Sequence, residues 1–431
     1  MFLRRRVTRV EKTLKGELIW YRRQGRIEFA LYVPLREALE GVLPEIVSIS
    51  GTPVPLLSQL QKVHEIYRHP ITLHKHVGRW VVDPIFAVLA GNTTFSGSRS
   101  DFRDLISMAA QQNLFLYVLP VDHVNSQEIW QGFVRIGYKK WISIPCPRPQ
   151  AVYNRIPNRV LERSAQSRRA KALLASQGIP MFNPEYFNKA SLYKILRNRG
   201  LQEYLPVTVE GLFPGIVERL LQRFGTVYLK PVDGSIGQGI MHIEHTSGEF
   251  RLRALVKHGV SYDCTCATWS ELWRAIQSHR LKGSYVVQQA IDRITWHERP
   301  CDFRILTQKD KRNWNIVGIG VRVAGPTSIT THVPNGGSIA SGVETLKRAF
   351  PENPDSVKMS LEQTAIRCAG AIDEHFQSQL GEMSVDLGVD PSGRVWFFEA
   401  NAKPMKFDEP VIRQRSLQGV LNYLQELARE S

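Results

Sequence analysis

Short apolar runs separated by polar residues dominate the chain and predict more strands than helices. Residues 16–21 and 26–33 are aromatic and β-branched, which is typical of strands. Residues 81–90 predict one further strand that ends in a turn. Helical spacing over 100–112, followed by the apolar run 114–119, completes a strand–helix–strand pattern. This pattern indicates a βαβ unit and a parallel sheet.

Three prolines mark residues 141–149 as a boundary or a rigid crossing between domains. Beyond it, helices are predicted over 162–177 and 191–199. The chain then turns to β structure, with predicted strands at 227–231, 240–243, 285–289, 303–308, 314–323 and 394–399 and helices at 270–279 and 361–380. This succession predicts an α+β half that contains antiparallel sheet.

Composition and charge narrow the class of protein. The 431 residues include 56 Lys and Arg against 40 Asp and Glu, which gives a formal net charge of +16. With 43% hydrophobic residues the chain can build two or three cores, which excludes a disordered chain and a disulfide-rich scaffold. Five irregularly spaced cysteines, without an apolar leader or spanning stretch, predict a soluble cytoplasmic protein. The basic excess fits nucleic acid, an acidic membrane, an acidic polymer or a phosphorylated small molecule.

A glycine-rich hairpin follows a predicted strand that delivers Lys230. The loop after this lysine contains Gly234, Ser235, Gly237 and Gly239. Glycines let backbone N–H groups turn toward a phosphate, and a serine hydroxyl adds a donor. The pattern is neither a Walker A loop nor a dinucleotide fingerprint, and glycine-rich hairpins are common, so by itself it indicates a phosphate site only weakly.

A second motif places acidic and amide side chains on two neighbouring strands. Asp386 lies on the first strand, and Glu399 and Asn401 lie on the second. Because side chains alternate along a strand, Glu399 and Asn401 share one face and Phe398 faces the other way. Carboxylate and amide oxygens suit Mg²⁺. A solvated sheet edge is the alternative, and Asp390 is assigned to the turn of the hairpin.

Two further predicted strands carry charged residues, of which the arginines could bind phosphate. Asp302 and Arg304 share one strand face, and Arg322 follows on the next predicted strand. An arginine in such a place can fork onto phosphate oxygens. Residues 286–291 are predicted as an apolar strand that runs into polar residues. Such a segment can offer backbone groups to a purine, or it can be a simple core strand.

In this order, the motifs resemble those of the ATP-grasp superfamily. A narrower resemblance covers about residues 82–427 and is to the YheC/YheD family of endospore coat-associated proteins. The segments that carry it are 90–95, 153–159, 182–184, 301–310, 335–337 and 399–404. The resemblance implies an α+β and α/β chain with an ATP-grasp fold, in which two α+β subdomains grip ATP after a βαβ pre-ATP-grasp domain. We therefore expect a small basic, β-rich region over 1–80, the pre-ATP-grasp domain over 81–180 and the ATP-grasp domain over 181–431.

The resemblance also implies a role for each motif residue. Contacts with ATP are expected from Lys189, Lys230, Gly234, Ser235, Gly237, Gly239, Gln288, Gln289, Ala290, Ile291 and Asp302. Ligands to one or two Mg²⁺ ions, or to Mn²⁺, are expected to be Asp386, Glu399 and Asn401. Arg304 and Arg322 are expected to act in catalysis by neutralising the phosphoryl group during its transfer.

The implied function is an ADP-forming ligase with ATP and Mg²⁺ as cofactors. Through an acyl-phosphate it would join a small-molecule or peptide carboxylate to an amine, or to a thiol, in endospore formation. The alternative is a non-catalytic ATP-binding protein of coat assembly. Spore-coat proteins are candidate partners, the mother-cell cytoplasm is the expected location, and a homodimer is one option for the oligomeric state. Nucleic acid ranks lowest as a partner because basic–aromatic recognition motifs are lacking.

Overall fold

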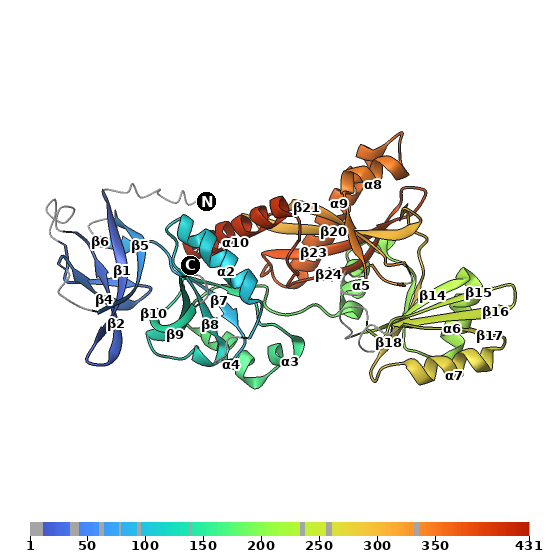
Figure 1. Ribbon diagram of the computed structural model, residues 1–431, viewed down its shortest axis with the longest axis horizontal. Helices are drawn as coiled ribbons and strands as arrows, with labels where there is room; N and C mark the ends of the chain where they lie inside the picture. The colour runs from blue at the N-terminus through green and yellow to red at the C-terminus, as the bar shows by residue number, and fades with distance from the viewer. Residues whose placement is uncertain are drawn as a thin grey trace, which may run out of the picture. The chain divides into compact units, whose positions relative to one another are not determined.

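The computed structural model describes residues 12–34, 43–59, 64–76, 79–92, 96–137, 140–232, 238–255, 261–326, 328–331 and 336–430, without the side chains of residues 76, 189, 190 and 261. The chain divides into two compact units (Figure 1). Unit 1 comprises residues 1–185 and 417–431, and unit 2 comprises residues 186–416. The three-part division at residues 80 and 180 stays a prediction.

Unit 1 begins with a six-stranded sheet, the first sheet, in the order β3-β4-β2-β1-β5-β6. Its strands are β1 (Lys12–Arg23), β2 (Arg26–Tyr32), β3 (Ile46–Ile49), β4 (Thr52–Leu57), β5 (His64–His76) and β6 (Arg79–Val82). β1 and β2 pair as an antiparallel hairpin, which confirms the two strands predicted there. Trp20, on β1, is fully buried, and its indole Nε1 donates to the carbonyl of Pro145 at 2.6 Å.

The second sheet of unit 1 contains the predicted βαβ unit. Its order is β10-β9-β8-β7-β11-β12. The elements are β7 (Phe86–Ala90), α2 (Arg99–Gln111), β8 (Leu116–Pro120), η1 (Val121–His123), β9 (Ile129–Ile136), β10 (Lys140–Pro147), β11 (Ala151–Asn154), α3 (Arg159–Glu162), α4 (Ala165–Ser176) and β12 (Met181–Phe182). β7 and β8 are parallel and joined by α2, so this prediction is confirmed. All five residues of each strand are buried, as expected for parallel strands covered on both faces.

Two predictions about this unit are wrong. Residues 81–90 do not form one strand, because Pro84 lacks the N–H that a continuous ladder needs and the chain passes from β6 to β7, in different sheets. The proline-rich residues 141–149 are not a boundary, because most of them form β10. β10 lies at the edge of its sheet, where prolines cost no ladder hydrogen bond.

Unit 2 begins with helix α5 and the third sheet, which is antiparallel throughout. Its order is β13-β18-β14-β15-β16-β17. The elements are α5 (Lys189–Asn198), η2 (Gln202–Tyr204), β13 (Thr208–Glu210), α6 (Pro214–Phe224), β14 (Thr226–Pro231), β15 (Met241–Thr246), β16 (Glu249–Leu255), β17 (Ser261–Cys266), α7 (Trp269–His279) and β18 (Tyr285–Gln289). Apolar residues of α6 and α7, such as Leu220 and Leu272, pack on strand residues such as Val227 and Val287 in one core.

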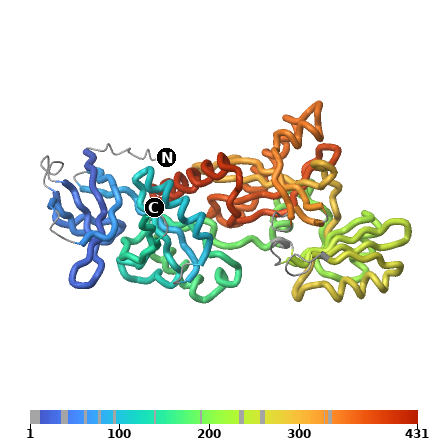
Figure 2. The backbone as a smooth tube through the Cα atoms, viewed as in Figure 1, coloured from blue at the N-terminus to red at the C-terminus, as the bar shows by residue number. Residues whose placement is uncertain are grey.

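The fourth sheet completes unit 2 and is also antiparallel, in the order β22-β21-β20-β23-β24, with β19 paired to β20. Its elements are β19 (Thr295–Trp296), β20 (Arg299–Asp310), β21 (Asn313–Val323), β22 (Ser338–Ala340), α8 (Gly342–Ala349), α9 (Pro354–His375), β23 (Glu382–Val389), β24 (Val395–Asn401) and α10 (Pro410–Glu430). Figure 2 shows this sheet in orange and red and the third sheet in green and yellow, so each is built from one stretch of chain. The antiparallel α+β half predicted from the sequence is confirmed.

Helices α5 and α9 cover the fourth sheet through a shared core that includes Leu196, Leu361 and Val385. The last part of α10 belongs to unit 1, where Leu421 and Leu424 pack with Phe102 of α2. No helix within the described ranges is long and apolar enough to cross a membrane.

Candidate active site

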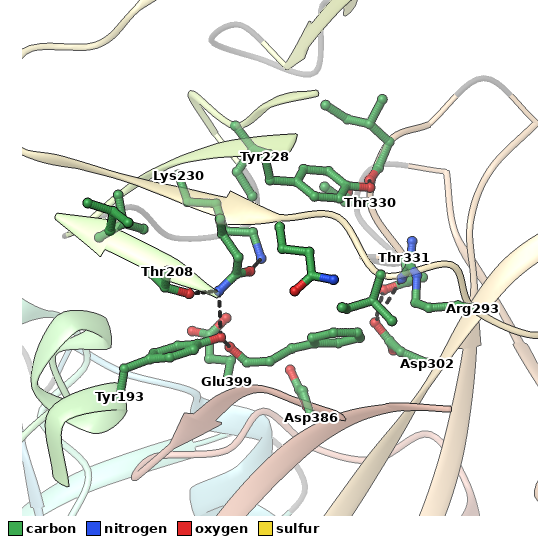
Figure 3. A pocket seen from close by; sticks show the side chains of 18 of the residues that line it. Tyr193, Thr208, Tyr228, Lys230, Arg293, Asp302, Thr330, Thr331, Asp386 and Glu399 are labelled. Carbon is green, nitrogen blue, oxygen red and sulfur yellow. Dashed lines mark hydrogen bonds and ion pairs between the residues drawn. The ribbon is translucent and has the colours of Figure 1, made fainter. Parts of the chain in front are cut away.

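A pocket of about 600 Å³ opens in unit 2 and is lined by residues from the third and fourth sheets and from α5 (Figure 3). Eight of the residues predicted to bind ATP, metal or phosphate line it together: Lys230, Gln288, Gln289, Ile291, Asp302, Arg322, Asp386 and Glu399. They come from six segments spread over 170 residues of sequence, and the two sheets bring them to one place. The pocket is therefore the candidate active site.

A buried glutamine organises the side of the pocket formed by the third sheet. Gln288 is 2% exposed, and its Oε1 accepts from Lys230 Nζ at 2.5 Å. Its Nε2 donates to the hydroxyls of Tyr193 and Thr208 at 2.8 and 2.9 Å. Lys230 and Gln288 are held side by side because β14 and β18 are neighbouring strands. The lysine ammonium is thereby fixed at the pocket wall before any ligand binds.

Tyr193 carries this network across to the fourth sheet. Its hydroxyl lies 3.2 and 3.1 Å from the carbonyl oxygens of Phe397 and Phe398, to which it donates. Burial raises the pKa of Tyr193, so the hydroxyl keeps its proton and remains a donor. This helical tyrosine joins α5, β18 and β24 by polar contacts in addition to packing.

The prediction that Phe398 faces away from Glu399 is wrong. β23 and β24 pair Asp386 with Glu399 but Leu387 with Phe397, so Phe398 is the extra residue of a β-bulge. Both Phe398 and Glu399 line the pocket. The ring lies above Gly388, whose missing Cβ would stand 2.3 Å from its Cζ.

Asp386 and Glu399 form the acidic end of the pocket as directly opposed residues of β23 and β24. Asn401 pairs with Ser384 further along the ladder, and it does not line the pocket. Within the described ranges no group of three or more His, Cys, Asp or Glu side chains gathers as a metal site. The predicted trio contains only two carboxylates, with an amide as its third member.

Asp386 nevertheless has the features of a metal ligand. It is 3% exposed, and its Oδ1 is buried without a hydrogen-bond partner. An unpartnered buried carboxylate oxygen is costly unless a proton or a cation meets it. Hard oxygen ligands of this kind suit Mg²⁺, so the residues present fit the predicted ion.

Arg322 bridges two carboxylates at the same end of the pocket. Its Nε donates to Asp302 Oδ1 at 2.8 Å, and its Nη2 lies 3.0 Å from Asp386 Oδ2. Thr331 donates its hydroxyl to Asp302 Oδ2, and Arg293 Nη1 lies 3.8 Å from the same oxygen. Burial would raise the pKa of Asp302, but Arg322 outweighs it and holds that pKa below the ordinary value. Asp302 is therefore an ionised anchor for the arginine.

Arg304 lies apart from the main pocket and lines a smaller cavity of about 50 Å³ that it shares with Arg322. Its Nη2 donates to Ser384 Oγ at 3.4 Å, its guanidinium lies 5.5 Å from the ring of Phe407, and its Nε is buried without a partner. Burial lowers the pKa of Arg304, which still leaves the group charged at neutral pH.

The other residues predicted to contact ATP either do not line the pocket or lie outside the described residues. Ala290 and Gly239 do not line the pocket, and the N–H of Gly239 already donates to the carbonyl of Leu255 at 2.8 Å. Gly234, Ser235 and Gly237 lie outside the described residues, as does the side chain of Lys189. Their roles stay predictions.

Several lining residues were missed by the sequence analysis. Tyr228 shares a strand face with Lys230, and period-two alternation could have found it. The pocket is also lined by Tyr193 from a helix and by Arg293 and Thr331 from two loops, and no sequence motif marks these positions.

The fold and this pocket define the class of protein. Two antiparallel α+β halves of unit 2 hold the pocket between them, and a βαβ-containing unit precedes them in the chain. This is the ATP-grasp fold, as the order of motifs implied.

Residues 178–427 match the family model described as YheC/D like ATP-grasp, and the chain belongs to that family. A curated relative, endospore coat-associated protein YheD of Bacillus subtilis (strain 168), is 27% identical over 353 residues, covering 78% of this chain and 76% of its own. Endospore coat-associated protein YheC of the same strain is 21% identical over 217 residues, or 49% and 58% of the two chains. Among solved structures, a D-alanine-D-alanine ligase from Coxiella burnetii matches with a TM-score of 0.49 at 17% identity, over 81% of this chain and 96% of that chain.

Proposed function

We propose that the protein is an ATP- and Mg²⁺-dependent ligase that activates a carboxylate as an acyl-phosphate and joins it to an amine or a thiol. The observation that carries the proposal is the convergence of Lys230, Arg322 and the pair Asp386–Glu399 on one pocket of about 600 Å³. A nucleoside triphosphate needs cationic side chains along its phosphates and hard oxygen ligands for its metal ion. This pocket offers both.

The nucleotide would lie across the pocket from the third sheet to the fourth. Residues 288–291 would face the adenine, Asp302 the ribose and Lys230 the α-phosphate. Tyr228 and Phe398 are two of the aromatic lining residues, and Lys230 Nζ lies 5.2 and 5.9 Å from their ring centres. These rings keep the lysine partly desolvated, which strengthens its attraction to phosphate.

Asp386, Glu399 and Asn401 would hold Mg²⁺, which when bound neutralises phosphate charge and aligns the phosphates. Arg322 and Arg304 would neutralise the phosphoryl group as it moves. In the first step a substrate carboxylate oxygen forms a bond to the γ-phosphorus, and the bond from that phosphorus to the β–γ bridging oxygen breaks, releasing ADP. In the second step the amine nitrogen attacks the acyl carbon, phosphate leaves, and the amine proton passes to solvent or to the departing phosphate.

The acyl-phosphate must be kept from water between the two steps. The family resemblance implies that the glycine-rich loop 234–239 closes over the triphosphate. Residues 233–237 lie outside the described ranges, so this closure stays a prediction. Removal of a phosphate-neutralising arginine is expected to slow turnover by about 10³-fold, by analogy with arginine fingers.

The test is ADP release with an acyl-phosphate trap. The protein is incubated with ATP, Mg²⁺ and a panel of amino acids, dicarboxylates and short peptides, and hydroxylamine converts any acyl-phosphate into a hydroxamate. Asp386→Asn and Glu399→Gln should abolish both signals. Asp390→Asn is the matched control, because that carboxylate lies in the turn of the same hairpin, where it accepts from Ser392 and Arg394. If the protein binds ATP but no candidate pair yields ADP or hydroxamate, the ligase proposal fails.

A non-catalytic role in coat assembly is the second candidate. It is favoured by the names of the two curated relatives, both called endospore coat-associated proteins. In that case the protein acts in the mother-cell cytoplasm with spore-coat proteins as partners, and the pocket serves nucleotide-dependent stability. Spores made with Asp386→Ala or Glu399→Ala protein would then assemble a normal coat, whereas the ligase proposal predicts a coat like that of the deletion strain.

A further inference from the structure

Arg322 holds two carboxylates that differ in how firmly they are engaged. Asp302 has both oxygens occupied, Oδ1 by Arg322 and Oδ2 by Thr331, and it is 4% exposed. Asp386 has one oxygen paired with Arg322, while its other oxygen is buried with no partner. The Asp302 end of the bridge is therefore anchored, and the Asp386 end is the one that can exchange.

Strand register explains why the anchored end is rigid. Asp302 and Arg322 are directly opposed on β20 and β21, and both side chains are nearly fully buried. Arg322 joins Asp302 through Nε, close to the stem of its side chain, and joins Asp386 through Nη2, at the tip. The guanidinium is a rigid plane, so small changes in the side-chain torsions that pivot this plane about the Nε contact can redirect the tip.

The charges around the bridge set the conditions for exchange. Asp302, Asp386 and Glu399 all act on Arg322, and Arg293 and Arg304 lie beside them. The cluster is thus close to neutral without a ligand, so a divalent cation added alone would leave buried positive charge in excess. When the cation binds together with a nucleotide, the negative charge of the phosphates balances its positive charge, and the phosphate oxygens offer Arg322 a new partner.

We propose that in the nucleotide-free protein Arg322 pairs with Asp386, the carboxylate proposed to bind the metal ion. When nucleotide binds, Nη2 of Arg322 exchanges Asp386 for a phosphate oxygen. Asp302 and Thr331 are the residues that position the arginine. This inference rests on the proposed function, because it takes Asp386 as a metal ligand. Arg322 then couples the two ligands: Asp386 becomes free for the cation only when a phosphate has replaced it as the partner of the arginine. Divalent cation binds weakly alone and tightly with nucleotide.

The experiment measures Mn²⁺ binding by electron paramagnetic resonance on the full chain, with and without the non-hydrolysable analogue AMPPNP. Wild-type protein should bind Mn²⁺ tightly only with AMPPNP. Arg322→Gln removes the competitor for Asp386, so nucleotide-free Mn²⁺ affinity should rise by about 5–150-fold, the usual range for coupled sites. A residue of merely structural importance would lower metal affinity when replaced, so the sign of the change is the decisive readout.

Arg304→Gln is the matched control. It removes an equal charge from the adjacent strand, but the hydrogen bond of Arg304 goes to Ser384 and not to the metal carboxylate. If both variants tighten Mn²⁺ binding equally, a general field effect explains the result and the exchange is refuted. If Arg322→Gln does not fold, Arg322→Lys decides, because it keeps the charge but cannot fork onto two carboxylates. This variant should also bind Mn²⁺ several-fold more tightly without nucleotide.

The outcomes separate this inference from the proposed function. Wild-type protein that binds no Mn²⁺ even with AMPPNP refutes the metal site of the proposed function itself. Wild-type protein that binds Mn²⁺ with AMPPNP, together with unchanged or weakened nucleotide-free binding in Arg322→Gln, refutes the exchange alone. Tighter binding in Arg322→Gln that Asp386→Asn abolishes in the double variant supports both.

Discussion

Replacing Gln288 with leucine tests whether the polar network or the apolar core holds the two sides of the pocket together. The change keeps the size of the side chain but removes an acceptor for Lys230 and a donor to Tyr193 and Thr208. A hydrogen bond to a charged group contributes about 1.5–3 kcal/mol, and each neutral one about 0.5–1.5 kcal/mol. Burial of the two methyl groups that replace the amide returns about 1–2 kcal/mol. We expect a net local loss of about 2–4 kcal/mol.

Hydrogen exchange is the suitable assay, because a chain with two compact units does not unfold in one step. Amides of β14 and β18 should exchange about 30–1000-fold faster in Gln288→Leu. ATP affinity should fall as well, because Lys230 loses the contact that fixes its ammonium.

Gln289→Leu is the matched control, since Gln289 is the next residue on the same strand. Among the hydrogen bonds of the described residues, its side chain makes only one, in which it accepts from Val207 N at 3.3 Å. It should leave exchange of β14 nearly unchanged. If Gln288→Leu exchanges at the wild-type rate, or no faster than Gln289→Leu, the network does not stabilise the pocket and the reasoning is refuted.

Three further predictions follow from single contacts. Lys230→Met should raise the Kd for ATP about 10–150-fold, as expected for a lost charge-assisted hydrogen bond, and an unchanged Kd by calorimetry would contradict the assigned pocket. Gly388→Ala places a methyl group 2.3 Å from the Phe398 ring, so thermal unfolding should shift by the equivalent of about 1–3 kcal/mol; an unchanged melting curve would show that the ring moves freely. Burial lowers the pKa of His69 to about 4 from 6.5, so as the pH falls the unfolded chain takes up a proton before the folded protein does. Folding stability from this group, on the order of 3 kcal/mol, is therefore fully present above pH 6.5 and is lost as the pH falls toward 4. His69→Phe should flatten this part of the stability–pH curve, and a curve of unchanged slope would rule out His69 as its source.

The sequence alone determined the class of fold and eight of the residues that line the pocket. Strand alternation and the order of the motifs pointed to Lys230, Asp302, Arg322, Asp386 and Glu399, and all five line the pocket. These residues were predictable because each lies on a strand with a local pattern of its own. The βαβ unit was predictable for the same reason, since its apolar runs are short and continuous.

Only the tertiary structure decided which partners these residues have. Phe398 turns into the pocket because of a bulge that depends on the pairing of β23 with β24, and no period of two along one strand can reveal it. Gln288 meets Tyr193 across 95 residues of sequence, through the packing of α5 beside the sheets. Arg322 was expected to face phosphate, yet it bridges Asp302 and Asp386, because sheet register sets three strands side by side. The sequence determines which chemical groups are present, and the register of the sheet, which depends on long-range pairing, determines which of them neutralise one another.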